Sequence, residues 1–241
     1  MTNAPTHTDA QAHTHAHAHT KASAQDFALP PTEKQIEIVM CEYDLPEGLN
    51  FSDGFVAVDT ESLGLKPHRD RLCLCQVSDG SGKVWLVPFP EGDYSKAINL
   101  KKILNDDNLC KIMHFARADI ATMELYLDVQ INNVYCTKIA SKLSRTYTEQ
   151  HGLGTLCREL LDISLNKEQQ ASYWAAEELT KAQQLYAAND VLYLHALRSV
   201  LDARLQEQGR HHHLLPCLAY LPHRARLDNA GWDDTDIFAH H

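Results

Sequence analysis

Two acidic side chains in this sequence are spaced so that they could bind a cation together. Asp59 and Glu61 follow the apolar stretch 55–58 and lie two residues apart. On a strand, residues at this spacing point to the same face, so their carboxylates are close and repel each other. One of them must then take up a proton, or a cation must lie between them. Alone the pair is weak evidence, because most such pairs lie at solvated strand ends.

Two further acidic positions follow along the chain. Asp119 comes five residues after His114 and is expected in the first turn of a helix, where the helix dipole alone would favour an acid. Tyr186 and Asp190 share one face of an apolar helix, where a structural hydrogen bond would also explain the pair. Together the four carboxylates could balance two divalent cations, and all-oxygen ligands favour Mg²⁺ or Mn²⁺ over zinc.

The segments around these residues predict an α/β fold in a single domain. Strands and helices alternate after an antiparallel meander, which indicates a mixed sheet flanked by helices. The expected strands are 36–39, 55–59, 72–77, 84–87 and 111–115. The expected helices are 98–104, 118–127, 137–144, 153–161 and one long helix from about 180 to 208, ended by Gly209.

Composition and charge exclude several classes of protein. The 241 residues contain 22 Lys and Arg against 32 Asp and Glu, a formal net charge of −10. Proteins that coat long nucleic acids usually carry a basic surface, so any such contact here must be local and assisted by cations. No apolar run is long enough to span a membrane, and no secretory signal is visible. The seven cysteines include no CxxC pair, so we expect reduced thiols in a cytoplasmic protein.

The two ends of the chain differ from its middle. Residues 1–35 form an Ala-, Thr- and His-rich leader that we expect to be disordered. Its histidines could bind a transition metal, but a solvated tail is the simpler interpretation because such a tract has no fixed geometry. Residues 210–241 include Pro216, Trp232 and Phe238. Such apolar residues need a surface to cover, so this segment is predicted as a C-terminal packing or oligomerisation tail.

The order DxE, HxxxxD and YxxxD resembles the three motifs of the DEDDy class of 3′–5′ exonucleases, whose fold is ribonuclease H-like. The segment Tyr-Ala-Ala-Asn-Asp-Val-Leu-Tyr-Leu at 186–194 is similar to the third motif of ribonuclease D. Segments 58–73, 136–148 and 227–240 resemble the nanoRNase C group of ribonuclease D-like enzymes, which cleave dinucleotides. The resemblance covers most of residues 50–205.

The resemblance implies a two-metal-ion site with a role for each motif residue. Asp59 would bridge both Mg²⁺ or Mn²⁺ ions, and Asp119 would help to hold one of them. Glu61 and Asp190 would hold the ion that bears the attacking water. Tyr186 would orient that water or help to remove its proton. The implied reaction is hydrolysis of the last phosphodiester at the 3′ end of RNA, which releases 5′-mononucleotides.

Five further side chains are candidates for substrate binding. In dinucleotide-cleaving relatives an apolar residue after the first motif lies between the two bases, and Leu65 has that position, although it could simply pack under its loop. His114 lies near the expected ions or merely ends its strand. Lys138, Arg145 and Tyr147 form a local basic and aromatic cluster, and we expect one or more of them to bind the 5′ phosphate. A solvated helix face is the simpler explanation for Lys138.

The length of chain after Asp190 bears on the substrate. The resemblance implies an exonuclease domain at 36–209, and too few residues follow for the helical domains with which ribonuclease D holds larger RNA. We therefore expect RNA dinucleotides and short oligonucleotides as substrates. Relatives usually carry Ser-Asp-Trp where this chain has Ser172-Tyr173-Trp174. Tyr173 therefore replaces an acid, but no expected metal ligand is lost. The resemblance also implies a ring-shaped homo-octamer.

Two other functions remain open beside the expected one. The expected function is a metal-dependent 3′–5′ exoribonuclease acting chiefly on 5′-phosphorylated dinucleotides. The nearest alternative is a broader ribonuclease D-like exonuclease that trims structured RNA or DNA 3′ ends. An alternative of another class is an inactive nucleic-acid-binding scaffold, which the four carboxylates and Tyr186 argue against.

Overall fold

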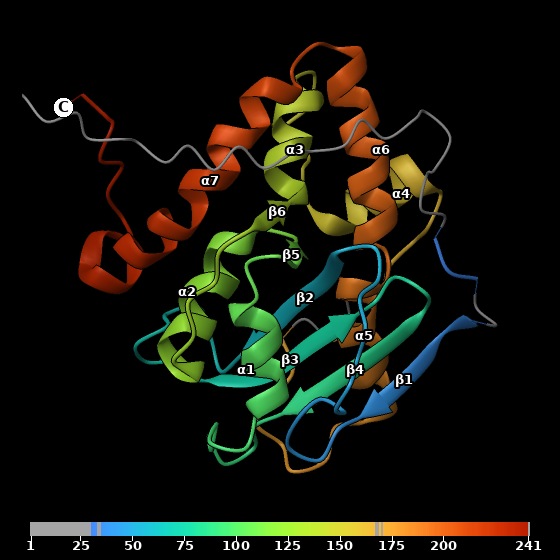
Figure 1. The fold of residues 1–241 in the computed structure, drawn as a ribbon, viewed down its shortest axis with the longest axis vertical. Helices are drawn as coiled ribbons and strands as arrows, with labels where there is room; N and C mark the ends of the chain where they lie inside the picture. The colour runs from blue at the N-terminus through green and yellow to red at the C-terminus, as the bar shows by residue number, and fades with distance from the viewer. Residues whose placement is uncertain (1–29, 33–34, 167–168, 170, 241) are drawn as a thin grey trace, which may run out of the picture.

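A mixed sheet of six strands forms the centre of the protein (Figure 1). The computed structural model describes residues 30–32, 35–166, 169 and 171–240, so most of the leader predicted at 1–35 lies outside the described residues. The strands are β1 (Glu37–Met40), β2 (Phe55–Ser62), β3 (Leu72–Ser78), β4 (Lys83–Pro88), β5 (Cys110–Met113) and β6 (Val134–Cys136). Their order across the sheet is β1-β4-β3-β2-β5-β6.

The antiparallel meander predicted from the sequence is formed by β2, β3 and β4. Every residue of β3 is buried, because this strand lies inside the sheet and is covered on both faces. The turn from β3 to β4 uses Gly80 and Gly82 at φ values of 81° and 110°, which a side chain would strain. The remaining pairs, β1 with β4, β2 with β5 and β5 with β6, are parallel.

Helices cover both faces of the sheet. They are α1 (Ile98–Asn105), α2 (Ala116–Leu127), α3 (Thr137–Ser144), α4 (Leu153–Leu161), α5 (Lys181–Leu192), α6 (Leu194–Glu207) and α7 (His211–Leu227), followed by a π-helical turn at Asp228–Trp232. Helix α5 packs against β2, β3 and β4, and Figure 1 shows it behind the sheet with α1 on the near side. A capping box fixes the start of α5, since Thr180 and Gln183 each accept a hydrogen bond from the other's backbone N–H.

The predicted mixed sheet, flanking helices and single domain are confirmed, with local corrections. The single long helix predicted from about 180 to 208 is wrong, because Tyr193 leaves helical geometry at φ −105° and ψ 1° and separates α5 from α6. Helix α5 packs on the sheet whereas α6 packs against α3, so the break redirects the chain. Strand β6 is absent from the prediction because three residues are too few to show an alternating pattern.

The C-terminal segment predicted at 210–241 contains one long helix. Helix α7 has 17 residues and packs against α2, α3 and β6. It continues through Pro216 and Pro222, and Pro222 is buried. None of the helices among the described residues is both long enough and apolar enough to cross a membrane.

Candidate active site

Three carboxylates from two elements meet at one end of β2. Asp59 and Glu61 lie on the same face of this strand, as their spacing predicts, and Asp190 reaches them from α5. One carboxylate oxygen from each residue can be chosen so that all three atoms lie within 4.8 Å of one another. The fold therefore brings the DxE pair together with the acid of the YxxxD motif.

The fourth predicted acid, Asp119, comes from α2 rather than from β2 or α5. It is buried in the first turn of α2, and its carboxylate accepts a hydrogen bond of 2.6 Å from the Thr60 hydroxyl. Alternation along β2 points Thr60 away from its two acidic neighbours. Asp119 is not a member of the three-carboxylate group, although its negative charge acts on Asp59 and Glu61. Thr60 thus holds Asp119 beside the three-carboxylate group. In the sequence, the only sign of this role is the alternation of β2, which turns Thr60 away from Asp59 and Glu61.

Burial and mutual repulsion raise the pKa values of these acids. The pKa of Asp59 lies well above its ordinary value. Burial is the largest cause, followed by the negative charge of Asp119 and then by the charges of Asp190 and Glu61. Burial and the charges of Asp190 and Asp119 raise the pKa of Glu61 to about 9. Burial also raises the pKa of Asp190 to about 7 and that of Asp119 to about 6. Four acids held this close resist ionisation together, and a bound cation would relieve the repulsion.

The available donors fit a hard divalent cation. The ligand atoms that Asp59, Glu61 and Asp190 offer are all carboxylate oxygens, which favour Mg²⁺ or Mn²⁺ over zinc. The nearby Cys157 thiol stays protonated, because burial and the charge of Asp190 raise its pKa. It therefore does not compete as a soft ligand.

Tyr186 lies one helical turn before Asp190 on the same face of α5. Its half-buried ring packs against Trp174, with the ring centroids 5.9 Å apart. Burial and the charges of Asp190 and Glu61 raise the pKa of its hydroxyl. The hydroxyl therefore remains a neutral hydrogen-bond donor, suited to orienting a water molecule or a phosphate oxygen.

His114 follows the last residue of β5. This strand runs parallel to β2, and extending their register by two residues places His114 beside Asp59. The Nδ1 atom of His114 lies 2.9 Å from the Thr137 hydroxyl oxygen. Burial and the charge of Lys138 lower the pKa of the imidazole to about 4. The ring is therefore neutral and can hydrogen-bond to a substrate without adding charge.

A cavity of about 470 Å³ opens beside the carboxylates, and Glu61, Leu65, Asp119 and Trp174 are among the residues that line it. This volume lies in the range of pockets that enclose small ligands. The side chain of Leu65 is 99% exposed. Packing of Leu65 under its loop, the alternative considered from the sequence, is therefore wrong, and the leucine is free to contact a ligand.

The loop that carries Leu65 is fixed by one buried acid. Asp70 accepts hydrogen bonds from the Lys66 N–H at 2.9 Å and from the Arg69 side chain at 2.6 Å. Gly64 lies so close to it that a Cβ atom there would be 2.4 Å from Asp70 Oδ2. A larger residue at position 64 would therefore displace the Asp70 carboxylate that fixes this loop.

The three predicted phosphate-binding residues do not all lie at the carboxylates, although the Arg145 guanidinium lies 5.9 Å from the Tyr147 ring centroid. Lys138 lies next to the site, where its charge acts on His114. Arg145 is fully buried, and its guanidinium donates to the Gln150 carbonyl oxygen and forms an ion pair with Glu159. Tyr147 is 73% exposed and does not line the 470 Å³ cavity. The fold thus brings Lys138 to His114 and Phe115, whereas both terminal nitrogens of Arg145 are bonded within the protein.

Replacing Arg145 with Met should destabilise the fold rather than weaken substrate binding. Removing one member of a buried ion pair costs about 3–5 kcal/mol, and we expect about 2–3 kcal/mol because Glu159 keeps partial access to solvent. The effect is measured by thermal denaturation of Arg145→Met and of a control variant, Arg158→Met, whose side chain is 58% exposed in the wild type. An unchanged Tm together with a large rise in KM for a dinucleotide would instead show that Arg145 binds the substrate.

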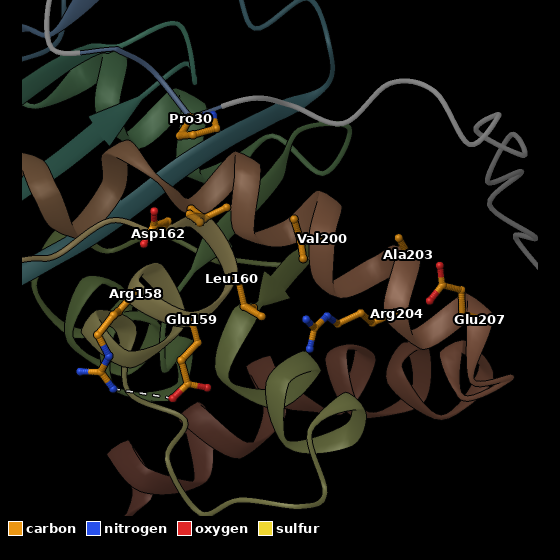
Figure 2. Close-up of a pocket in the computed structure, with 10 residues that line it drawn as sticks. Pro30, Arg158, Glu159, Leu160, Asp162, Val200, Ala203, Arg204 and Glu207 are labelled. Carbon is orange, nitrogen blue, oxygen red and sulfur yellow. Dashed lines mark ion pairs between the residues drawn. The ribbon is translucent and has the colours of Figure 1, made fainter.

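A larger cavity of about 800 Å³ lies between α4 and α6 (Figure 2). Leu160, Val200 and Ala203 give it an apolar lining, and its charged residues are of both signs. Arg158 and Glu159 pair with each other at 3.6 Å, as the dashed line in Figure 2 marks. None of the four predicted acids lines this cavity. The predicted acids therefore lie beside the smaller cavity and not beside the larger one.

Phe115 is a residue at the site that the sequence motifs do not single out. It precedes α2 in the left-handed conformation, at φ 63° and ψ 39°, which is uncommon for an aromatic residue and recurs at functional sites. Its side chain is 47% exposed, and the Lys138 Nζ lies 4.1 Å from its ring centroid. No sequence signal for this backbone conformation exists at a phenylalanine.

Comparison with known proteins agrees with this geometry. Residues 37–206 match a family model described as 3′-5′ exonuclease. Ribonuclease D from Jannaschia sp. is 30% identical over 171 residues, which are 69% of this chain and 44% of that protein. Ribonuclease D from Pseudomonas paraeruginosa is 30% identical over 65% of this chain and 40% of its own length. The chain thus spans less than half the length of these curated relatives.

Solved structures give a closer match. Brucella melitensis NrnC bound to pGG is 48% identical with a TM-score of 0.82, over 86% of this chain and all of that one. The same protein with bound Mg²⁺ is also 48% identical, with a TM-score of 0.81 and the same coverage. Escherichia coli RNase D is 26% identical with a TM-score of 0.59, over 73% of this chain and 44% of that one. The chain therefore belongs to the ribonuclease D-like family of 3′–5′ exonucleases.

Proposed function

We propose that this protein is a metal-dependent 3′–5′ exoribonuclease that acts chiefly on 5′-phosphorylated RNA dinucleotides and releases 5′-mononucleotides. The observation that carries the proposal is the group formed by Asp59, Glu61 and Asp190, whose oxygens lie within 4.8 Å beside a cavity of about 470 Å³. Membership in a 3′–5′ exonuclease family supports the reaction. The Mg²⁺-bound structure of NrnC, at 48% identity, supports the cofactor.

Each acid has a distinct part in this proposal. Asp59, Glu61 and Asp190 would hold one ion, and Asp119 would help Asp59 to hold a second. Hard divalent ions bound there neutralise charge on the phosphate and make water a stronger nucleophile. Tyr186 would orient the attacking water through its hydroxyl, which keeps its proton because burial raises its pKa.

Three observations support a short substrate. The cavity of about 470 Å³ beside the acids is lined by the loop of Leu65 and by Trp174. Lys138 and the neutral His114 provide a local positive charge and a hydrogen-bonding group for phosphate in a chain of net charge −10. The 48% identical NrnC is bound to pGG, the notation for a two-guanosine strand with a 5′ phosphate.

Leu65→Ala should weaken turnover of dinucleotides without affecting stability. The side chain is 99% exposed, so its removal costs no core packing, whereas loss of stacking against a base costs about 1–3 kcal/mol, or roughly 5- to 150-fold in kcat/KM. Ile98→Ala, an exposed leucine-sized side chain on α1, is the control. Equal kcat/KM values for Leu65→Ala and wild type would show that Leu65 does not contact the substrate.

The decisive test compares substrates of different length. Purified protein in Mg²⁺ is given a 5′-phosphorylated dinucleotide, the same dinucleotide without the phosphate, and a seven-nucleotide RNA. We expect the phosphorylated dinucleotide to give the highest kcat/KM. Equal rates on the dinucleotide and the longer RNA would instead favour a broader exonuclease. Binding without turnover of all three would favour a scaffold.

We also propose that the protein is cytoplasmic and self-associates. All seven cysteines are free, which suits a reducing compartment. Trp232, Ile237 and Phe238 are exposed near the C-terminal end of the described chain, where a second subunit could cover them. The ring-shaped octamer implied by the resemblance is tested by light scattering on the eluted protein, and a monomer would contradict it.

A further inference from the structure

Gln76 in β3 lies directly opposite Asp59 in β2. Opposite residues of an antiparallel pair point to the same face of the sheet, with Cβ atoms about 4.5–5.5 Å apart. Asp59 faces α5, since its carboxylate groups with that of Asp190. The amide of Gln76 therefore extends into the layer between the sheet and α5, beside the acid that the proposed function places at the centre of the metal site.

The amide of Gln76 is buried without a partner. Its side chain is 0% exposed, and neither Oε1 nor Nε2 forms a hydrogen bond with any described residue. An unpaired buried amide is costly, so its presence in the core calls for an explanation.

The strand neighbours of Gln76 on this face include one acid. Along β3 the same face carries Leu74 and Ser78, and across the strands it carries Leu86 and Asp59. The leucines offer nothing polar, and the Ser78 hydroxyl already donates to the Lys83 carbonyl oxygen and accepts from the Gly80 N–H. Of these neighbours only Asp59 carries a carboxylate, and it lies on the same face as the Gln76 amide in the directly opposite position.

We propose that Gln76 is a positioning residue, whose Nε2–H donates to the Asp59 carboxylate when that carboxylate binds the divalent ion. The hydrogen bond fixes the rotation of the carboxylate and leaves its other lone pairs to the metal. Groups that orient a metal ligand in this way typically contribute 10- to 100-fold to metal affinity. The inference rests on the proposed function only in requiring that Asp59 be a ligand.

The test measures metal binding without substrate. The full chain is stripped with a chelator and titrated with Mn²⁺, and free Mn²⁺ is counted by electron paramagnetic resonance. We expect Gln76→Met, which keeps the length but loses the N–H, to raise the Kd at least tenfold. Gln76→Asn, whose amide is one methylene too short, should do the same. Val77→Ala, on the same strand but the other face, is the control and should bind like wild type.

Metal-free Tm values separate positioning from damage to the fold. Gln76→Met removes an unpaired buried amide, so it should melt no lower than wild type in chelator. A Kd for Gln76→Met within twofold of wild type would overturn the proposal, as would an equal loss of affinity in Val77→Ala. If wild-type protein binds Mn²⁺ but does not cleave RNA, the proposed function is wrong, whereas the role of Gln76 in metal binding is unaffected.

Discussion

Asp59→Asn should lower dinucleotide hydrolysis by at least about a thousandfold at saturating Mg²⁺. The substitution keeps the size and shape of the side chain but removes one of the three charges that group within 4.8 Å. Loss of metal-based stabilisation of the transition state is worth several kcal/mol, and about 4 kcal/mol corresponds to roughly a thousandfold in rate. The measurement is the release of mononucleotide from a 5′-phosphorylated dinucleotide.

A matched control for this substitution is Asp162→Asn. Asp162 lines the 800 Å³ cavity and has φ 59°, a left-handed conformation that asparagine adopts readily. It should retain full activity, which would also exclude the larger cavity from catalysis. Activity of Asp59→Asn within tenfold of wild type would contradict the metal-ligand assignment, provided that both variants fold as judged by circular dichroism.

Much of the site follows from the sequence because its geometry is local. The two-residue spacing of Asp59 and Glu61 fixes them to one strand face, and the four-residue spacing of Tyr186 and Asp190 fixes them to one helix face. These local spacings do not say that α5 lies next to β2, which depends on the tertiary fold. The resemblance to a known family supplied that placement, since periodicity alone does not say which helix covers which strand.

Other features depend on distant partners and could not be predicted. Arg145 looks like a phosphate ligand in sequence, yet its donors are used by Glu159 and by a carbonyl oxygen of the following loop. Tyr193 interrupts an apolar helical pattern because α6 packs on α3 instead of the sheet. Gln76 lies within an apolar strand run, where only the register with β2 reveals that it faces an acid.

Removal of divalent metal should make the stability of the protein fall as the pH rises. Burial and repulsion raise the folded pKa of Glu61 to about 9 and that of Asp190 to about 7, above the values of about 4 expected in the unfolded chain. The folded state then binds more protons than the unfolded state. Its advantage is complete below pH 4 and is lost as the pH rises through the folded pKa values.

Bound Mg²⁺ should reverse this dependence, because the ion takes the place of the protons and binds only the folded, ionised cluster. Even about two of the units by which these pKa values are raised correspond to about 3 kcal/mol, or roughly 6–12 °C in Tm for a chain of this size. The Tm difference between Mg²⁺ and chelator should therefore grow by that amount from pH 5 to pH 8. Taking the difference cancels titration elsewhere, such as that of Lys111, whose pKa burial lowers to about 8. A difference that stays constant with pH would mean that the acids are not neutralised by protons in the metal-free protein.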